Sequence, residues 1–134
     1  MNFKIDQYQA YDWEILKEWW EDHGWTPIPD SFLPNVGKIV RIEEVPVCAG
    51  FLYRTDSLIC ILEWVISDKK SDRIIREQAL DLLIETLIEV AKKAGFKMIH
   101  TSIKHPRLIE RMKKHGFSIN DEGMTNMSLF FGEE

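Results

Sequence analysis

Apolar residues recur at steps of three and four between positions 75 and 94, which is the spacing of one face of a helix. Gly95 can adopt the left-handed backbone that ends a helix. The pattern therefore predicts one long helix that packs on a core and stops at Gly95. Its apolar stripe consists of Ile75, Ala79, Leu82, Leu83, Leu87, Val90, Ala91 and Ala94.

Two shorter elements follow this helix. Residues 97–103 are too few for another helix and have the β-branched content of a strand. Pro106 suits the first position of a helix, because its missing N–H costs nothing there, and Gly116 can end that helix. A helix, a buried strand and a second helix form a crossover unit, so we expect this half of the chain to be α/β.

The N-terminal half alternates strand-like and helical patterns. Residues 3–7 and 38–43 predict strands, and residues 13–23 predict a helix capped by Asp12. Three prolines between positions 27 and 34 exclude a long helix or a central strand there, although one helical turn at 31–33 is compatible with them.

The centre of the chain predicts a β-hairpin. Residues 47–53 and 58–67 are strand-like and are separated by a four-residue turn, which would pair Tyr53 with Leu58. This register places Glu63 beside Cys48, where a carboxylate is unusual. Two last strands, 117–119 and 124–131, would bring the sheet to about six to seven strands. In this register the face around Glu63 also carries Gly50, Leu52, Ile61 and Val65.

Composition bounds the class of protein. A chain of 134 residues that is 45% hydrophobic predicts one domain, 1–134, with a real core. It has no apolar run long enough for a membrane span and no signal-like N-terminus, so we expect a cytoplasmic protein. Cys48 and Cys60 lie in apolar runs and are interpreted as buried free thiols. No Cys/His spacing indicates a metal site.

Charge is unevenly distributed. The net charge is −5, and residues 1–30 carry seven acids against two bases. Residues 92–114 carry eight bases and one acid, which is compatible either with solvated helix faces or with a local site for ligand phosphates. The overall acidic balance argues against direct nucleic-acid binding.

The order of these elements resembles the Gcn5-related N-acetyltransferase (GNAT) superfamily over nearly the whole chain. VPVCAGFLY resembles the family's third strand, LLIETLIEVAKKAGFKMIHTSI its main helix and fifth strand, and HPRLIERMKKHGF its fourth helix. The N-terminal YDWEILKEWWEDHGWTPIPDSFLP resembles small phage-encoded members. The resemblance implies a mixed, mostly antiparallel α/β (α+β) sheet flanked by helices.

The resemblance also implies acetyl-CoA as cosubstrate. The fourth and fifth strands would splay apart to admit its pantetheine arm, and the main helix would bind its pyrophosphate at the N-terminus. The family's phosphate loop finds its nearest match in residues 76–81, but both glycines are missing. Glycine permits close approach of phosphate to backbone, so binding would be weak or differently placed. The cofactor-binding residues implied are Val65, Ser67, Arg76, Gln78, Ala79 and His105.

Two further positions depart from the family pattern. His105 stands where many members have Asn, and it is interpreted either as a base or as a helix-cap residue. Met112 stands where many members have a Tyr that protonates the leaving thiolate. Methionine cannot donate a proton, so another group or solvent does so, or there is no transfer.

Acetylation of an amine requires that a base or a water chain take a proton. Glu63 on the central strand is the first candidate, because an apolar setting would raise its pKa. The alternative is that Glu63 is half exposed or paired with an arginine. His23 and His105 are the other candidate bases. The residues expected to bind the acceptor are Trp20, Trp25, Tyr53, Thr101 and Ser102.

Two hypotheses of different class follow. The first is an acetyl-CoA-dependent N-acyltransferase acting on a small amine, a modified nucleobase or a protein amine. The second is a degenerate GNAT-fold protein that binds a partner without catalysis, which the missing glycines and Met112 favour. An open edge strand near the C-terminus would allow a homodimer in either case.

Overall fold

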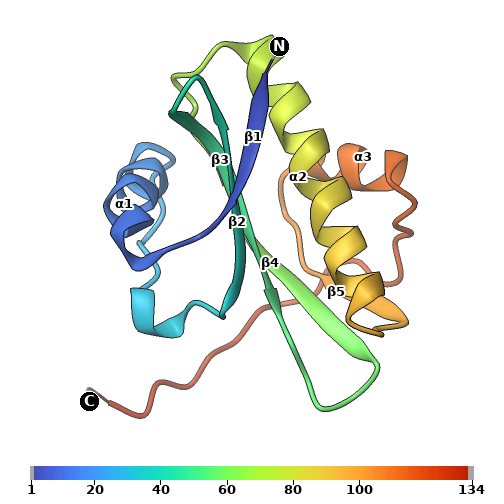
Figure 1. Ribbon diagram of the computed structural model, residues 1–134. Helices are drawn as coiled ribbons and strands as arrows, with labels where there is room; N and C mark the ends of the chain where they lie inside the picture. The colour runs from blue at the N-terminus through green and yellow to red at the C-terminus, as the bar shows by residue number, and fades with distance from the viewer. Residues whose placement is uncertain (1, 133–134) are drawn as a thin grey trace.

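A computed structural model describes residues 2–132 of the chain. A five-stranded sheet, in the order β1-β2-β3-β4-β5, separates helix α1 on one face from α2 and α3 on the other (Figure 1). The strands are β1 (Phe3–Gln7), β2 (Val36–Ile42), β3 (Val45–Tyr53), β4 (Ile59–Ser67) and β5 (Met98–Thr101). The helices are α1 (Trp13–Asp22), α2 (Arg73–Lys93) and α3 (Pro106–Lys114), with 3-10 turns η1 (Ala10–Asp12) and η2 (Asp30–Phe32).

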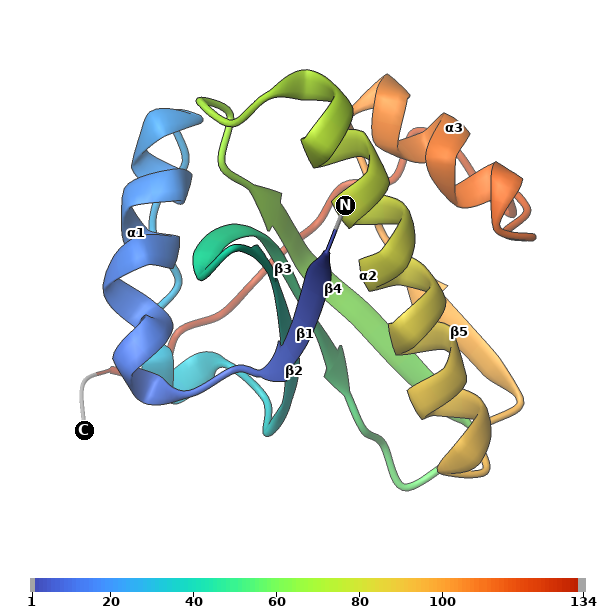
Figure 2. The same ribbon diagram turned by 45° about the horizontal axis from the view of Figure 1, so that its top comes forward.

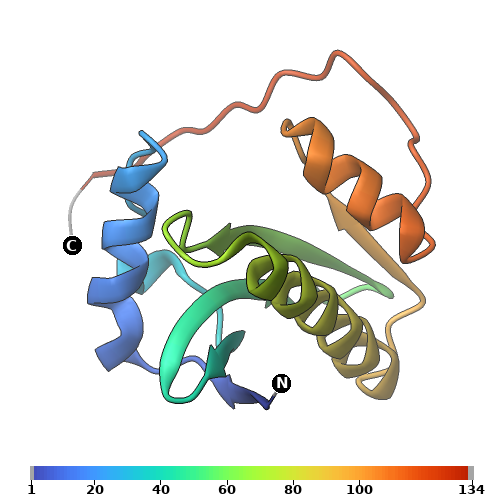
Figure 3. The same cartoon turned by 90° about the horizontal axis from the view of Figure 1, so that it is seen from above.

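The predicted architecture is confirmed in its main features. Strands β1 to β4 pair in antiparallel fashion, and β4 and β5 are parallel and joined through α2. The prediction of six to seven strands is wrong for the described residues. Segments 117–119 and 124–131 form no strand, and residues 118–132 instead run as an extended, exposed segment (Figure 3). The strand-like sequence of this segment has no neighbouring strand to pair with.

Two apolar clusters, one on each face, hold the layers together. On the α2 face, Cys48, Leu52 and Leu62 pack against Leu83 and Leu87. Cys48 and Cys60 are both free and buried there, as predicted, and burial raises the pKa of both thiols. On the α1 face, the cluster consists of Tyr8, Leu16, Trp19, Trp20, Ile39, Ala49, Phe51 and Ile66.

Helix α2 spans 21 residues and begins at Arg73. The carboxylate of Asp72 accepts a hydrogen bond from the Ile75 N–H at 3.1 Å, which caps the helix at this point. In the described part of the chain, no helix has both the length and the apolar character needed to cross a bilayer.

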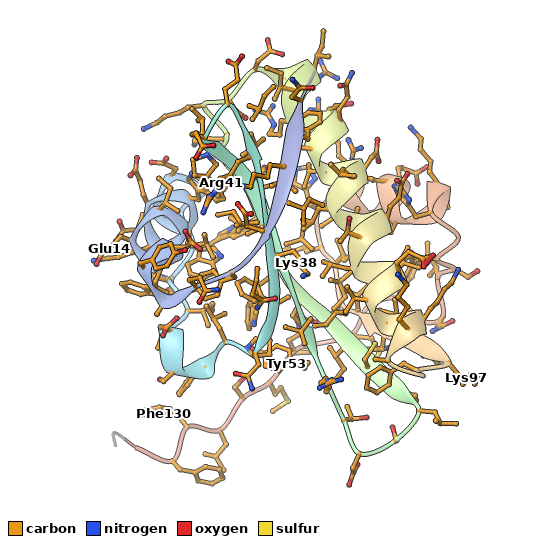
Figure 4. All side chains as sticks on the ribbon, in the orientation of Figure 1. Glu14, Lys38, Arg41, Tyr53, Lys97 and Phe130 are labelled. Atoms are coloured by element: carbon orange, nitrogen blue, oxygen red, sulfur yellow. The ribbon has the colours of Figure 1, made fainter. Side chains whose placement is uncertain are left out.

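Asp12 does not cap α1, contrary to the prediction. Its carboxylate accepts from the Gln9 N–H at 2.9 Å and pairs with the Arg41 guanidinium at 2.9 Å. Arg41, labelled in Figure 4, also pairs with Asp6 at 3.2 Å. A buried carboxylate needs such partners because burial removes its hydration. The interaction joins η1 to β2 and thereby fixes where α1 starts.

The β3–β4 register differs from the prediction. Tyr53 pairs with Ile61 and Glu63 lies opposite Phe51, so Glu63 is not beside Cys48. The reason is the length of the connection between the strands. Residues 54–58 belong to neither strand, and the pairing begins only at Tyr53 and Ile61, so the connection is longer than the expected four-residue turn. A shift in register moves a side chain to a new neighbour and, when it is odd, to the other face.

We expect Gly37→Ala to destabilise the protein by about 1–3 kcal/mol, as overpacking of a core does. A Cβ at position 37 would lie 2.5 Å from the Phe51 ring and 3.0 Å from the Tyr8 Cβ. Urea denaturation measures the change. If the contact with Phe51 is the cause, Gly37→Ala should cost less in a Phe51→Leu background than in the wild type. Equal costs in both backgrounds would contradict this explanation.

Candidate functional site

The candidate site lies where β4 continues beyond its parallel neighbour. The two strands pair only over Ile59–Leu62 and Met98–Thr101, and the Thr101 hydroxyl donates to the Leu62 carbonyl at 2.7 Å. Strand β4 runs on to Ser67 whereas β5 ends at Thr101 (Figure 2). Within residues 2–132, the backbone edge of 63–67 that faces β5 therefore has no strand partner. This unpaired stretch of β4 includes Val65 and Ser67, both predicted to bind cofactor.

A β-bulge interrupts β4 within this stretch. Gly50 of β3 faces two residues, Trp64 and Val65, because the pairing shifts by one between Ala49 and Phe51. Trp64 has φ +58, a conformation that costs energy for a bulky residue. Sequence analysis missed this bulge, although Gly50 inside a strand was a usable signal for it.

The Trp64 side chain is held by a chain of hydrogen bonds. Its indole N–H donates to the Tyr53 hydroxyl at 2.7 Å, and that hydroxyl donates to the Phe32 carbonyl at 2.7 Å. Burial raises the pKa of Tyr53. Tyr53, a predicted acceptor-binding residue, thus connects the bulge to the proline-rich loop. The sequence could not have indicated that the backbone carbonyl of Phe32 accepts this hydrogen bond, because any residue type provides such a carbonyl.

Glu63 lies directly before the bulge and faces the α1 side. Directly opposed residues in a sheet share a face, and its partner Phe51 packs in the cluster under α1. Glu63 is half-buried, and burial raises its pKa, while the backbone of Ser102 and the charge of His100 oppose this shift. Within the described residues, no arginine or lysine lies within salt-bridge distance of Glu63. The structure therefore places Glu63 and Ser102 together at the point where the strands part.

His23 follows α1 and contacts the far end of β4. Its Nε2 lies 3.0 Å from the Ser67 carbonyl, and its ring stacks on Trp25 at a centroid distance of 5.0 Å. A carbonyl only accepts, so Nε2 carries the proton and Nδ1 holds the lone pair in the neutral ring. Trp25 is 50% exposed beside it.

Three predicted site residues have other surroundings than expected. Trp20 is fully buried in the α1-face cluster and presents no surface to a ligand. His105 caps α3, because its Nδ1 accepts from the Arg107 N–H at 3.2 Å. Ala79 is fully buried against the sheet. Trp20 on α1 and Ala79 on α2 thus belong to the two cores on opposite faces of the sheet and not to a pocket.

The start of α2 also differs from the expected phosphate loop. Residues 76–81, including Gln78, lie inside the helix, so their amides are not presented at its N-terminus. Arg76 donates to the carbonyls of Lys69 at 3.2 Å and Ser71 at 2.9 Å and so closes the loop before the helix.

The helix N-terminus retains donors for an anion. Within residues 2–132, the amides of Arg73 and Ile74 have no acceptor. Lys69 and Lys70 are exposed beside them. A pyrophosphate therefore fits only in part, because the Asp72 carboxylate already occupies one position at this end.

Met112 stands at the position where the family resemblance implied a proton-donating Tyr. It is buried in the α2-face cluster, and its thioether cannot donate a proton. In the portion of the chain described, no three His, Cys, Asp or Glu side chains are grouped so that they could hold a metal ion.

Comparison with known proteins identifies the fold. No family model and no curated protein matches the sequence. The solved structures that match include the ribosomal-protein-S18-alanine N-acetyltransferase from Escherichia coli, with a TM-score of 0.72 and 15% identity over 90% of this chain and 80% of that one. Glucosamine-6-phosphate N-acetyltransferase from Arabidopsis thaliana matches with a TM-score of 0.66 and 16% identity, over 98% of this chain and 100% of that one.

A third match is N-acetylglutamate synthase from Neisseria gonorrhoeae, complexed with coenzyme A and N-acetyl-glutamate. It has a TM-score of 0.70 and 14% identity, over 91% of this chain and 30% of that one. These identities show a common fold and no more. The chain therefore has the fold of GNAT acetyltransferases, as the sequence resemblance implied.

We expect the stability of Glu63→Gln, relative to wild type, to depend on pH. The pKa of Glu63 is raised in the folded state, so the folded protein holds the proton more tightly than the unfolded chain. The wild type therefore loses stability as pH rises from the ordinary value of 4.5 through the folded pKa. A glutamine side chain does not titrate, so the Glu63→Gln variant does not lose stability in this way as the pH rises.

Urea denaturation across pH 4 to 8 checks this expectation. The stability advantage of Glu63→Gln over wild type should increase with pH, whereas Glu89→Gln, on an exposed helix position, should show no such trend. A pH-independent difference for Glu63→Gln would contradict the raised pKa.

Proposed function

We propose that this protein is an acetyl-CoA-dependent N-acyltransferase that moves an acetyl group directly to an amine. The observation that supports this best is the unpaired stretch of β4 with the half-buried Glu63 at its beginning. An extended ligand needs backbone donors and acceptors, and β4 supplies them between Glu63 and Ser67. The shared fold with N-acetyltransferases supports the same reaction class.

In this proposal each group of the chain has one task. The backbone of Val65 and Ser67 binds the pantetheine arm, and the amides of Arg73 and Ile74 bind the pyrophosphate. Glu63 takes the proton from the attacking amine, directly or through water, since its raised pKa makes it a better base near neutral pH. As the amine nitrogen bonds to the acyl carbon, the carbon–sulfur bond breaks. The thiolate takes a proton from water, and Glu63 returns the proton of the amine to the solvent, which restores both the base and the water.

The acceptor would lie on the α1 face, beside Glu63. Tyr53 lies close to Glu63, and the exposed Trp25 stacks on His23 at the other end of this stretch of β4. His23 is the alternative base, through its Nδ1. Thr101 ends β5 and Ser102 follows it beside Glu63, so that either residue could position the amine or a water. A small amine, a modified nucleobase or a protein amine fits this proposal, and the resemblance to phage-encoded members favours the last two. A cytoplasmic location would supply acetyl-CoA.

A second candidate function is that of a GNAT-fold binding protein without transfer. Met112 is buried and cannot donate a proton, and Asp72 places a negative charge at the start of α2. Both features would weaken turnover or cosubstrate binding. They leave the fold intact as a scaffold for a partner.

Calorimetric titration of the purified protein with acetyl-CoA separates the two functions. Micromolar binding would support the acyltransferase and justify a screen of amines by release of free thiol. In that screen Glu63→Gln should lower kcat by about 100-fold or more, the usual worth of a general base, with unchanged acetyl-CoA affinity. Glu89→Gln serves as the matched control. Absence of binding up to millimolar concentrations would refute the acyltransferase.

We expect Asp72→Asn to strengthen acetyl-CoA binding about two- to fivefold, because a charge near a helix terminus is worth about 0.3–1 kcal/mol. Asparagine keeps the cap, since its side-chain oxygen can still accept from the Ile75 N–H. The same titration measures the change at low and high salt. A weaker or unchanged affinity would mean that the pyrophosphate does not bind at the start of α2.

A further inference from the structure

His23 occupies a fixed position at the end of helix α1. Gly24 adopts a left-handed backbone with φ +77, and its N–H donates to the Glu21 carbonyl at 2.9 Å. The Trp25 N–H donates to the Trp20 carbonyl at 2.8 Å. These two bonds form the Schellman motif that ends a helix. Since the ring of His23 also stacks on Trp25, both its backbone and its side chain are held in place.

The Ser67 carbonyl, which His23 contacts, points to the open edge of β4, the backbone edge of residues 63–67 that faces β5. The Asp68 N–H belongs to the same peptide unit and donates to the Val47 carbonyl of β3 at 2.9 Å. The N–H and C=O of one trans peptide unit point in opposite directions, so the Ser67 carbonyl points away from β3. The His23 Nε2 lies 3.0 Å from this carbonyl and donates to it. His23 therefore takes the place of a strand partner at the far end of the open edge.

A second contact holds α1 against the same end of β4. The Asp22 carboxylate lies 3.6 Å from the Lys70 ammonium, in the loop that follows β4. Figure 2 shows the end of α1 beside this loop. The loop is also closed on itself, because the Lys70 N–H donates to the Asp68 carboxylate at 2.9 Å. The bond between His23 and Ser67 thus joins two elements that further contacts already hold together.

The bond affects any ligand that pairs with the open edge. In the proposed function this ligand is acetyl-CoA, whose pantetheine arm carries amide N–H groups that require acceptors. The Ser67 N–H points to the same side as its carbonyl and can still donate to the ligand. The carbonyl itself is already filled by the imidazole N–H. A ligand donor that reaches Ser67 must therefore displace His23 or remain unpaired, and an unpaired donor costs free energy.

We propose that His23 is a positioning residue, which competes with acetyl-CoA for the Ser67 carbonyl and so limits the stretch of β4 with which the ligand pairs. The inference rests on the proposed function, because it takes acetyl-CoA as the ligand of this edge. Pairing along a strand repeats every two residues, or about 7 Å. A ligand that slid by one such step toward Ser67 would carry its acyl group away from Glu63, and a base acts only within about 3 Å. His23 thereby keeps the ligand in the register that Glu63 requires.

Two substitutions separate this role from that of a base. A glutamine side chain offers an amide N–H in place of the imidazole Nε2–H, but it does not take up a proton near neutral pH. The function of a base would be lost in both His23→Gln and His23→Ala. The competition for the Ser67 carbonyl would be lost only in His23→Ala.

Calorimetric titration with acetyl-CoA measures the competition. His23→Ala should bind acetyl-CoA about two- to tenfold more tightly than the wild type, since the ligand gains one hydrogen bond of ordinary net strength. His23→Gln should restore the wild-type affinity. Glu21→Gln, which alters an exposed side chain in the same turn of α1, is the control and should bind as the wild type does. Circular dichroism verifies that each variant is folded.

Amide NMR spectra locate the change. The Asp68 N–H shares its peptide unit with the Ser67 carbonyl, so its chemical shift reports a new bond to that carbonyl. On addition of acetyl-CoA, this signal should move several-fold further in His23→Ala than in the wild type or in His23→Gln.

The outcomes distinguish a failure of this inference from a failure of the proposed function. Equal or weaker binding by His23→Ala, or a gain in affinity that His23→Gln shares, overturns the role of His23 and leaves the acyltransferase in place. Absence of acetyl-CoA binding by the wild type up to millimolar concentrations overturns the proposed function and this inference with it.

Discussion

The bulge at Trp64 is the constraint on which both the core and the candidate site depend. One extra residue in β4 shifts the alternation of side chains, so that Leu62 and Val65 both face α2 while Ile66 packs under α1. A positive φ at a bulky residue costs on the order of 1–3 kcal/mol. Packing of the indole and its bond to Tyr53 offset this cost. The strain is thereby placed next to Glu63, at the point where β4 loses its parallel neighbour.

At the start of α2, the interaction that stabilises the helix also opposes the binding of an anion. The Asp72 carboxylate stabilises the helix by satisfying an amide and by opposing the positive end of the dipole. The same properties make it a competitor for any anion that binds there. Arg76, which could have compensated, instead donates to two loop carbonyls. A protein with this cap gains stability without ligand at the expense of anion affinity.

The sequence predicted the elements whose signals are local and missed those that depend on pairing. The apolar stripe from Ile75 to Ala94 gave α2, and Pro106 and Gly116 bounded α3, since periodicity and caps act within one helix. Burial raises the pKa of Glu63, as the sequence led us to expect, but the predicted neighbour Cys48 was wrong because loop length and the bulge set the register. Segment 124–131 has strand-like alternation, yet alternation alone does not provide a strand to pair with, and the segment joins no sheet in the described residues.

The point at which β5 ends determines the surroundings of Glu63 on β4. Because β5 ends at Thr101, the edge of β4 that faces β5 has no strand partner beyond Leu62 within residues 2–132, and Ser102 lies next to Glu63. A four-residue edge strand is held on one side only, so its end is free to fray. The Ser102 backbone opposes the raised pKa of Glu63, so the position of the chain just beyond β5 influences how tightly this carboxyl holds its proton.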